Sequence, residues 1–501
     1  MSTPGSYNAC IDLLDRNVDA GIGDAPALMS RQRTVTYAEL LEAVKRTAGG
    51  LAALGVRPEQ RVAMVMLDSV EFYQVFLGAM RIGAIPVPLN PLLPGRDLAG
   101  IVAGSRARTL VVSHERGGEV AGIGPAAPEL TQIIVTGSAD WERLLTAGDP
   151  IPAYATWDES PGFWLCTSGS TGTPKLAMHR HIDLRASFDT YATQVLRVSS
   201  ADRCYSVGPM FHAYGLGNSL TFPLVAGACA IVEPARPPTP SLVRDIVSRF
   251  QPTLFFCIPT LYAALLASDL PDDTFASVRQ GVSAAESLPA DTHQRFLDRF
   301  GVEILDGIGS TEMTHIFVSN RAGESRPGTS GRPVAGYEVE LLDERGSPVS
   351  PGMPGHLFVG GESMATGYWC ASGPSRRAFQ GPRMRTGDMY ERSADGHYTY
   401  LGRSDDMLRV GGEWVSPAEV EAVLISDPTV LEAAVVGRRD EMGTLRPMAY
   451  VVASPGAVVD TGELEVRCKA ELAGYKRPNR FEVVESLPKT ATGKVQRYKL
   501  R

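Results

Sequence analysis

Residues 167–175 read Thr-Ser-Gly-Ser-Thr-Gly-Thr-Pro-Lys and directly follow the apolar segment Phe163–Cys166. Glycines let a turning backbone bring N–H groups close to an anion, while hydroxyl groups and a lysine add further donors and positive charge. The stretch therefore predicts a loop that holds phosphate groups. The residues expected to bind nucleotide in this loop are Thr167, Ser168, Gly169, Ser170, Thr171, Gly172, Thr173 and Lys175.

Two other interpretations explain this loop less well. A flexible Ser/Gly linker does not need the Pro174–Lys175 ending or a flanking apolar segment. A nucleoside-triphosphatase loop, GxxxxGK[ST], requires glycine where Pro174 stands and Ser or Thr where Leu176 stands. Two of its diagnostic positions therefore carry the wrong residue.

Four further segments follow the loop along the chain. Gly307–Glu312 reads Gly-Ile-Gly-Ser-Thr-Glu, Arg385–Asp388 reads Arg-Thr-Gly-Asp, Gly402–Asp406 reads Gly-Arg-Ser-Asp-Asp, and Pro488–Lys494 reads Pro-Lys-Thr-Ala-Thr-Gly-Lys. In this order and spacing the set resembles the motifs of the acyl-adenylate-forming enzymes, which include acyl- and aryl-CoA synthetases, adenylation domains and beetle luciferases. The resemblance covers essentially the whole chain.

The resemblance implies a reaction in two halves. A carboxylate attacks the α-phosphate of ATP to give an acyl-adenylate and pyrophosphate, and a thiol such as that of coenzyme A then displaces AMP. The first half brings two anions together, which costs roughly 4 kcal/mol at 4 Å and an effective dielectric near 20, so positive charge is required. The resemblance assigns catalysis to Lys494, to Glu312 as the ligand of Mg²⁺, to Thr311 at the α-phosphate and to His212 beside the acyl carboxylate.

The resemblance also implies where the rest of the nucleotide binds. Asp388 resembles the aspartate that accepts hydrogen bonds from the ribose hydroxyls, and Arg403 the arginine that contacts ribose and phosphate. Ile308 stands where the family often has an aromatic residue, so it would pack on adenine without aromatic stacking. The residues expected around adenine are Ser283, Ala284, Ala285, Asp306, Gly307 and Ile308.

One of these segments also invites a different interpretation. Residues 281–285 read Gly-Val-Ser-Ala-Ala, a near match to the nucleophile elbow G-x-S-x-G of serine hydrolases. Ala285 occupies the final glycine position, where a side chain crowds the turn. A serine hydrolase is therefore disfavoured.

The tract from Ala213 to Asn218, with the segment after Glu312, looks especially like benzoate-CoA (aryl-CoA) ligases. A tyrosine and small residues can sandwich a flat ring in a short slot, whereas a long acyl chain needs an open tunnel. Plain core packing of these side chains is the open alternative. The residues expected to bind the acid are His212, Ala213, Tyr214, Gly309, His315 and Lys494.

The C-terminal segment predicts the acceptor. From Lys476 to Arg501 eight basic residues stand against two acidic ones, and this positive charge suits the phosphates of coenzyme A. A carrier protein is also acidic, so charge alone leaves a stand-alone adenylation enzyme that loads a carrier protein as the alternative. Asp405 matches the family's hinge. The residues expected to bind CoA are Gly411, Gly412, Tyr475, Lys476 and Arg477.

Composition sets broader limits. The 501 residues carry 56 Asp and Glu against 48 Lys and Arg, a net charge of −8, which argues against a nucleic-acid or membrane-surface binder because both targets are anionic. Seven scattered cysteines without a CxxC pair predict reduced thiols. Since the first residues resemble no signal peptide, we expect a cytoplasmic location. The expected oligomeric state is a monomer or a homodimer. His179 and His181 lack a third ligand and are expected at the surface.

Alternating strand and helix signals over the first 140 residues predict βαβ units and a parallel sheet. The predicted fold class is α/β: a large body, residues 1–404, followed by a small mobile α+β lid, residues 405–501. Within the body we expect two α/β units, about 1–180 and 181–330, and a β-rich unit, 331–404. A non-catalytic nucleotide sensor is disfavoured because all the charged motif residues are present.

Overall fold

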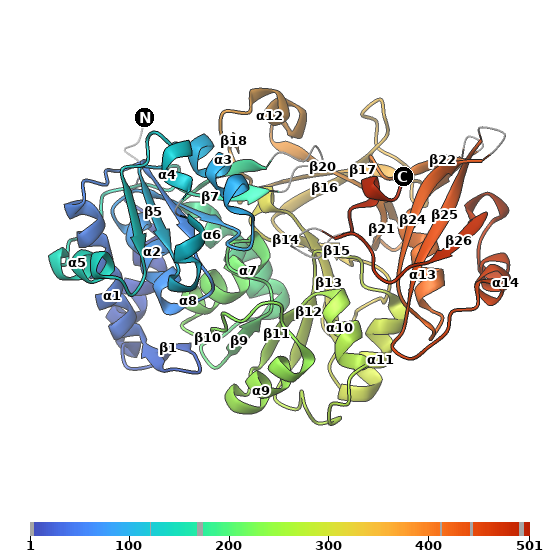
Figure 1. Ribbon diagram of the computed structural model, residues 1–501, viewed down its shortest axis with the longest axis horizontal. Coiled ribbons are helices and arrows are strands. Elements are labelled where there is room, and N and C mark those ends of the chain that lie inside the picture. Colours follow the sequence, from blue (N-terminus) through green and yellow to red (C-terminus); the bar gives the residue numbers. More distant parts are fainter. Residues whose placement is uncertain (1–4, 121, 168–173, 411–412, 441–443, 490–494) are drawn as a thin grey trace.

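The computed structural model describes residues 5–120, 122–167, 174–410, 413–440, 444–489 and 495–501. Figure 1 shows a body rich in helices and sheets at the N-terminal side and a smaller C-terminal part at the opposite end of the molecule. The architecture confirms the predicted α/β fold class with a separate C-terminal α+β part.

The first sheet is built from βαβ units. Its four strands pair in parallel in the order β4-β3-β5-β6. All residues of β4 and β5 are buried, as expected for parallel strands that are covered on both faces. The elements are β3 (Arg61–Val65), α2 (Val70–Arg81), β4 (Ile85–Leu89), α3 (Gly95–Ser105), β5 (Thr109–Val112), α4 (Ile123–Ala126), β6 (Gln132–Val135) and α5 (Ala139–Ala147).

The second sheet has nine strands in the order β15-β14-β13-β12-β11-β9-β10-β1-β2. The strands from β1 to β13 along this order are parallel, and β2, β14 and β15 are antiparallel to their neighbours. The strands are β1 (Pro26–Met29), β2 (Thr34–Thr36), β9 (Arg203–Ser206), β10 (Cys229–Ile231), β11 (Leu254–Cys257), β12 (Gln280–Ser283), β13 (Ile304–Gly309), β14 (Ile316–Ser319) and β15 (Arg332–Pro333). The helices around them are α6 (Ile182–Ser187), α7 (Ala213–Gly215), α8 (Phe222–Ala226), α9 (Pro240–Phe250), α10 (Pro259–Leu266) and α11 (Ala290–Phe300).

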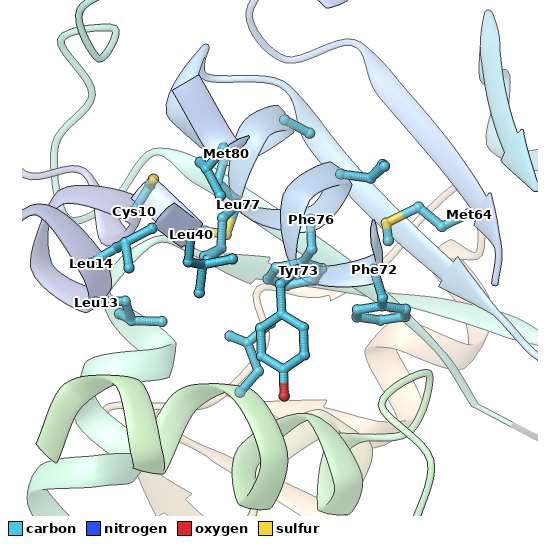
Figure 2. Close-up of a cluster of buried hydrophobic side chains, with 14 of the residues drawn as sticks. Cys10, Leu13, Leu14, Leu40, Met64, Phe72, Tyr73, Phe76, Leu77 and Met80 are labelled. Carbon is cyan, nitrogen blue, oxygen red and sulfur yellow. The ribbon is translucent and has the colours of Figure 1, made fainter. Parts of the chain in front are cut away.

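Helices α1 and α2 pack at the junction of these two units. Helix α1 (Tyr37–Ala53) begins with a capping box, in which Thr36 Oγ1 accepts from Glu39 N at 3.2 Å and Glu39 Oε2 accepts from Thr36 N at 2.8 Å. Figure 2 shows the apolar cluster that includes Leu40 of this helix, with the Tyr73 hydroxyl directed toward a neighbouring helical segment. There it donates to the Ser219 carbonyl at 2.6 Å, so a buried hydroxyl links the two units.

An antiparallel sheet and the C-terminal part complete the chain. The sheet has the order β16-β17-β20-β19, with β21 beside β20, and the C-terminal part packs two helices on its own buried cluster. The strands of both parts are β16 (Tyr337–Leu342), β17 (Gly355–Gly361), β19 (Phe379–Gln380), β20 (Arg383–Arg392), β21 (Tyr398–Arg403), β22 (Leu408–Val410), β23 (Glu413–Val415), β24 (Val430–Arg439), β25 (Leu445–Ala453) and β26 (Arg480–Val483). Their helices are α12 (Ser372–Ala378), α13 (Pro417–Ile425) and α14 (Thr461–Glu471).

The limits of the predicted units near residues 180, 330 and 404 stay predictions. Sheet membership adds that β1 and β2 belong to the nine-stranded sheet, although they precede the whole of the first sheet in the sequence. All seven cysteines are free thiols, as expected. Within the described ranges, no helix combines the length and apolar character that crossing a bilayer would require.

Candidate active site

The predicted phosphate loop joins two antiparallel strands. β7 (Pro161–Thr167) and β8 (Lys175–Arg180) pair so that Thr167 lies opposite Lys175. The expected binding residues between them, Ser168, Gly169, Ser170, Thr171, Gly172 and Thr173, lie outside the described residues. A nucleoside-triphosphatase loop leads from a strand into a helix whose N-terminus faces the phosphates. Because this loop is followed by a strand, the arrangement argues against that class.

Lys175, Tyr368 and Glu312 form a chain of contacts at the base of the loop. β18 (Gly367–Tyr368) pairs with β8, and the Lys175 Nζ lies 5.2 Å from the centre of the Tyr368 ring. The Tyr368 hydroxyl donates to Glu312 Oε1 at 2.6 Å. Burial and the adjacent Glu312 charge raise the pKa of Tyr368, which keeps the hydroxyl a donor. Sequence analysis missed Tyr368 because only strand pairing brings it to this place.

Glu312 suits a magnesium ion that is shared with nucleotide phosphates. It is buried in η6 (Thr311–Met313), a 3₁₀ turn in which Ser310 Oγ accepts from Met313 N at 3.2 Å. Among the described residues, no three His, Cys, Asp or Glu side chains form a group that could hold a metal by themselves. Since Mg²⁺ usually binds one or two carboxylates together with phosphate oxygens and water, one buried glutamate fits it.

The expected adenine residues lie at the end of β12 and on the adjacent parallel strand β13. Ser283, the last residue of β12, is opposite Asp306 of β13. Ser283 Oγ and Asp306 Oδ1 are buried without a hydrogen-bond partner, and burial raises the pKa of Asp306. Ala285 has a φ of 75°, the left-handed region in which glycine is favoured. Ligands of open α/β sheets bind at such strand ends, where an N–H donor would satisfy these oxygens.

The expected ribose residues face each other across β20 and β21. Asp388 lies opposite Arg403, whose Nη1 donates to Asp388 Oδ1 at 3.0 Å and to the Thr386 carbonyl at 3.1 Å. Gly387 between them has a φ of 82°, and a Cβ there would lie 2.7 Å from Arg403 Nη2. The glycine therefore leaves room for the guanidinium, and the pair presents one carboxylate and one cation at the same edge.

The expected acid-binding residues also converge. His212 immediately precedes α7, which holds Ala213 and Tyr214, and its ring packs on Phe211 at 4.6 Å. The Tyr214 hydroxyl lies 3.2 Å from the Cys257 carbonyl at the end of β11 and 3.2 Å from the Val282 carbonyl of β12. The Tyr214 ring is stacked on His315 with centroids 5.6 Å apart.

His315 sits in a box of aromatic rings. Tyr191 and Phe222 lie 5.1 Å and 4.5 Å from it, and Asn218 Oδ1 is 3.1 Å from its Nε2. Burial lowers the pKa of His315 to about 3, so the ring is neutral and its Nε2–H donates to Asn218. Backbone comes close on two sides, because a Cβ on Gly309 would lie 2.5 Å from the His315 carbonyl and one on Gly217 2.3 Å from His315 Cδ2.

The lid residues of the prediction are only partly described. Lys494, Gly411 and Gly412 lie outside the described residues. The residues that flank the Lys494 segment are fixed, since Lys489 and Val495 form an antiparallel bridge. The expected hinge residue Asp405 lies in the turn between β21 and β22, where its carbonyl accepts from Arg501 Nη2 at 3.2 Å.

The expected CoA residues Tyr475, Lys476 and Arg477 lie at η7 (Gly474–Lys476) and just after it. Lys476 Nζ is paired with Glu419 Oε1 at 2.7 Å, and Arg477 Nε donates to the Leu472 carbonyl at 2.9 Å. Both cations therefore have partners inside the lid. Their role toward CoA remains a prediction.

One expectation is wrong. His179 and His181 were expected at the surface, but both are buried: His179 is on the inward face of β8, and His181 lies at the start of α6, directly after that strand. His181 Nδ1 accepts from Ala9 N at 3.2 Å, and His179 Nε2 lies 2.9 Å from the Thr311 carbonyl. The polar neighbour Arg180 obscured this alternation in the sequence.

Comparison with known proteins agrees with this geometry. Residues 14–369 match the AMP-binding enzyme family and residues 419–494 match the AMP-binding enzyme C-terminal domain. The chain is 43% identical to the benzoate–CoA ligase of Thauera aromatica, over 100% of this chain and 97% of that protein.

Two solved structures are also similar. The anthranilate CoA ligase AuaEII, solved with anthranoyl-AMP, has a TM-score of 0.96 and 38% identity over 100% of this chain and 97% of its own. A benzoate CoA ligase from Burkholderia xenovorans LB400 has a TM-score of 0.91 and 41% identity over 99% of this chain and 100% of its own. Because the two family models match in order and the first covers more than half of the chain, the chain belongs to the AMP-binding enzyme family.

Proposed function

We propose that this chain is an ATP-dependent, AMP-forming aryl-CoA ligase that converts benzoate or a small substituted benzoate to its CoA thioester. The observation that carries the proposal is the convergence of two groups of side chains on neighbouring strand ends. Ser283 is the last residue of β12, and Asp306 lies opposite it on β13. The stacked rings of Tyr214 and His315 lie beside the same strands. A nucleotide and a flat acid would therefore meet at one edge of the sheet.

In the first half-reaction the acid's carboxylate oxygen attacks the α-phosphorus of ATP, and the bond to the bridging oxygen of pyrophosphate breaks. Lys175 and Lys494 supply positive charge where the two anions approach, and Asp388 holds the ribose hydroxyls. Glu312, fixed by the Tyr368 hydroxyl, presents a carboxylate to Mg²⁺. When bound, Mg²⁺ neutralises phosphate charge and orients the leaving pyrophosphate.

In the second half-reaction the thiol sulfur attacks the acyl carbon of the aryl-adenylate and AMP leaves. Asp405 serves as the pivot about which the lid rotates, so that Lys494 withdraws and residues 411–412 with Tyr475–Arg477 approach. The carboxylate of the bound acid rests beside His212, and its ring lies between Tyr214 and the backbone near Gly309. The identity to benzoate–CoA and anthranilate CoA ligases supports an aromatic acid.

The two half-reactions can be tested separately. Wild-type protein should release pyrophosphate with ATP and benzoate, consume free CoA, and turn over alkyl acids poorly in the same panel. Lys494→Ala should lower pyrophosphate release by on the order of 10²-fold and largely spare thioester formation from pre-made benzoyl-adenylate. Lys499→Ala, an exposed lysine of the same lid, is the matched control.

Each result has a defined meaning. Equal loss in both half-reactions would contradict the role of Lys494. Pyrophosphate release without CoA consumption would favour loading of a carrier protein, and no release with any aryl acid would overturn the proposed function.

A further inference from the structure

His179 lies beneath the turn that carries Thr311 and Glu312. It is 1% exposed, and its ring is stacked on Phe163 with centroids 4.9 Å apart. Its Nε2 lies 2.9 Å from the Thr311 carbonyl oxygen and its Nδ1 lies 3.0 Å from Asp183 Oδ2. This imidazole is thus the link between a buried carboxylate and the backbone of the proposed catalytic turn.

The partners of His179 define its protonation. A carbonyl oxygen only accepts, and Asp183 already accepts from Arg180 N at 3.0 Å and from Arg180 Nε at 2.9 Å, so its carboxylate is ionised. Both ring nitrogens of His179 thus face hydrogen-bond acceptors, and Thr314 Oγ1 also lies 3.3 Å from Nδ1, an arrangement that suits an imidazolium. Asp183, which is fully buried, pairs with both His179 Nδ1 and the Arg180 guanidinium, and the Phe163 ring stacks on the imidazole.

The turn above His179 holds an unfavourable backbone conformation. Thr314, a β-branched residue, has a φ of 66° and a ψ of −37°. Such residues persist only where the surrounding structure over-determines them. Here the Thr314 hydroxyl donates to the Ser363 carbonyl at 3.0 Å, and Ser363 Oγ donates to the Met313 carbonyl at 2.8 Å.

The carbonyls of the turn are held one by one. The Glu312 carbonyl accepts from Ala365 N at 2.7 Å, the Met313 carbonyl from Ser363 Oγ, and the Thr311 carbonyl from His179. The Thr311 carbonyl also accepts from Thr314 N at 3.2 Å, so His179, at 2.9 Å, makes the shorter of the two bonds that hold this carbonyl and is the side chain that does so.

We propose that His179, as an imidazolium oriented by Asp183, is a positioning residue that fixes the Thr311–Glu312 turn for ATP and Mg²⁺. The proposal rests on the proposed function in assigning nucleotide and metal to this turn. His179 touches neither reactant, so its effect passes through the Thr311 carbonyl. It acts on the first half-reaction, in which phosphate charge is neutralised, and leaves the second half-reaction unaffected.

The test compares His179→Gln, which keeps one N–H near Thr311 but removes the charge, with Asp183→Asn, which removes the counter-charge. His181→Asn is the matched control, since His181 is a buried histidine that directly follows β8 and Asn can still accept from Ala9 N. In His179→Gln the KM for ATP and the half-saturating Mg²⁺ concentration should each rise by on the order of tenfold. Thioester formation from benzoyl-adenylate should stay within about twofold, and His181→Asn should change neither constant.

Two measurements do not depend on turnover. The thermal shift that Mg·ATP induces in the wild type should shrink in both variants, and it should be retained in His181→Asn. In ¹⁵N-histidine spectra of the wild-type protein, the resonance absent from His179→Gln should be that of a doubly protonated ring. If His179→Gln does not fold, the kinetic test uses Asp183→Asn instead. The His179 resonance is then identified as the histidine resonance whose chemical shift changes in Asp183→Asn.

The outcomes separate this proposal from the proposed function. Unchanged ATP and Mg²⁺ constants in both folded variants, a neutral His179 ring, or equal losses in the two half-reactions would overturn the positioning role. Wild-type protein that is inactive with every aryl acid would instead overturn the proposed function, while the spectrum and the Mg·ATP shift would still decide the state and role of His179.

Discussion

At the scale of single residues, His315 shows how tightly the candidate acid pocket is built. Its ring contacts three aromatic side chains, and Asn218 fixes its Nε2–H. The backbone of Gly217 passes so close that a Cβ would lie 2.3 Å from His315 Cδ2. Since packed interiors transmit small displacements, the orientation of His315 depends on the absence of a side chain at residue 217.

The substitution Gly217→Ala should therefore push His315 out of its stack on Tyr214. We expect kcat/KM for benzoate to fall at least about tenfold, with a loss of stability of about 1–3 kcal/mol from overpacking. Gly100→Ala is the control, because nothing lies within 4 Å of a Cβ there and the residue is on the exposed face of α3. Steady-state kinetics and urea denaturation check both; wild-type kinetics in Gly217→Ala would show that His315 does not shape the pocket.

Some site residues can be identified from the sequence and others cannot, and the difference lies in what positions each side chain. Glu312 and Asp388 lie inside short motifs whose local backbone sets their place, so sequence alone identifies them. Tyr368 and His179 reach the site only through the pairing of β18 with β8 and of β8 with β7. The pairing of β18 with β8 and the contact of His179 with Thr311 each join segments more than a hundred residues apart in the chain, so no local pattern encodes them.

At the scale of elements, the strand pair β20–β21 carries the candidate ribose site at one end and a turn at the other. Asp388 and Arg403 face each other at the site end, while Asp395 at the turn pairs with Arg326 at 3.0 Å on the surface. The two aspartates thus belong to the same strand pair but differ in their exposure to solvent. Only Asp388 is buried.

Asp388→Asn should weaken nucleotide binding without disturbing this strand pair. Because a hydrogen bond to a charged group contributes about 1.5–3 kcal/mol, the KM for ATP should rise about 10- to 100-fold. Asp395→Asn should leave the KM within about twofold, because exposed ion pairs contribute little. If the two variants bind ATP equally well, measured by calorimetry, Asp388 does not hold the ribose.

The same scale shows what local signals can predict. Helices α9 and α13 carry such signals at their starts, since Thr239 and Ser416 cap them and proline stands in the first turn of each. The place of β1 in the nine-stranded sheet was not predictable. Its partner β10 comes about 200 residues later, and parallel pairing over that distance is decided by packing rather than by neighbouring sequence.

At the scale of the whole molecule, stability depends on histidines that are buried without charge. Burial lowers the pKa of His315 to about 3 and that of His181 to about 4. An unfolded histidine titrates near 6.5, so below that pH the unfolded chain binds protons that the native state does not. These two residues therefore stabilise the fold fully above about pH 6.5 and progressively less toward pH 4.

Between pH 7.5 and pH 5 each histidine should lower the free energy of unfolding by about 2 kcal/mol. Urea denaturation at a series of pH values measures this loss. Over this pH range the free energy of unfolding of His181→Asn should fall by about 2 kcal/mol less than that of the wild type, because one buried neutral histidine is absent. A variant with the wild-type pH dependence would show that His181 is not held neutral in the native protein.

The two unpartnered oxygens at the ends of β12 and β13 have a practical consequence. A buried acceptor without a donor costs about 1–3 kcal/mol, and Ser283 Oγ and Asp306 Oδ1 both bear this penalty. A small nucleobase that donates an N–H there would offset it, independently of any acid or thiol. Adding adenosine or AMP to purification and storage buffers should therefore prolong the shelf life of the protein, and a melting screen of adenine derivatives would rank inhibitors without a turnover assay.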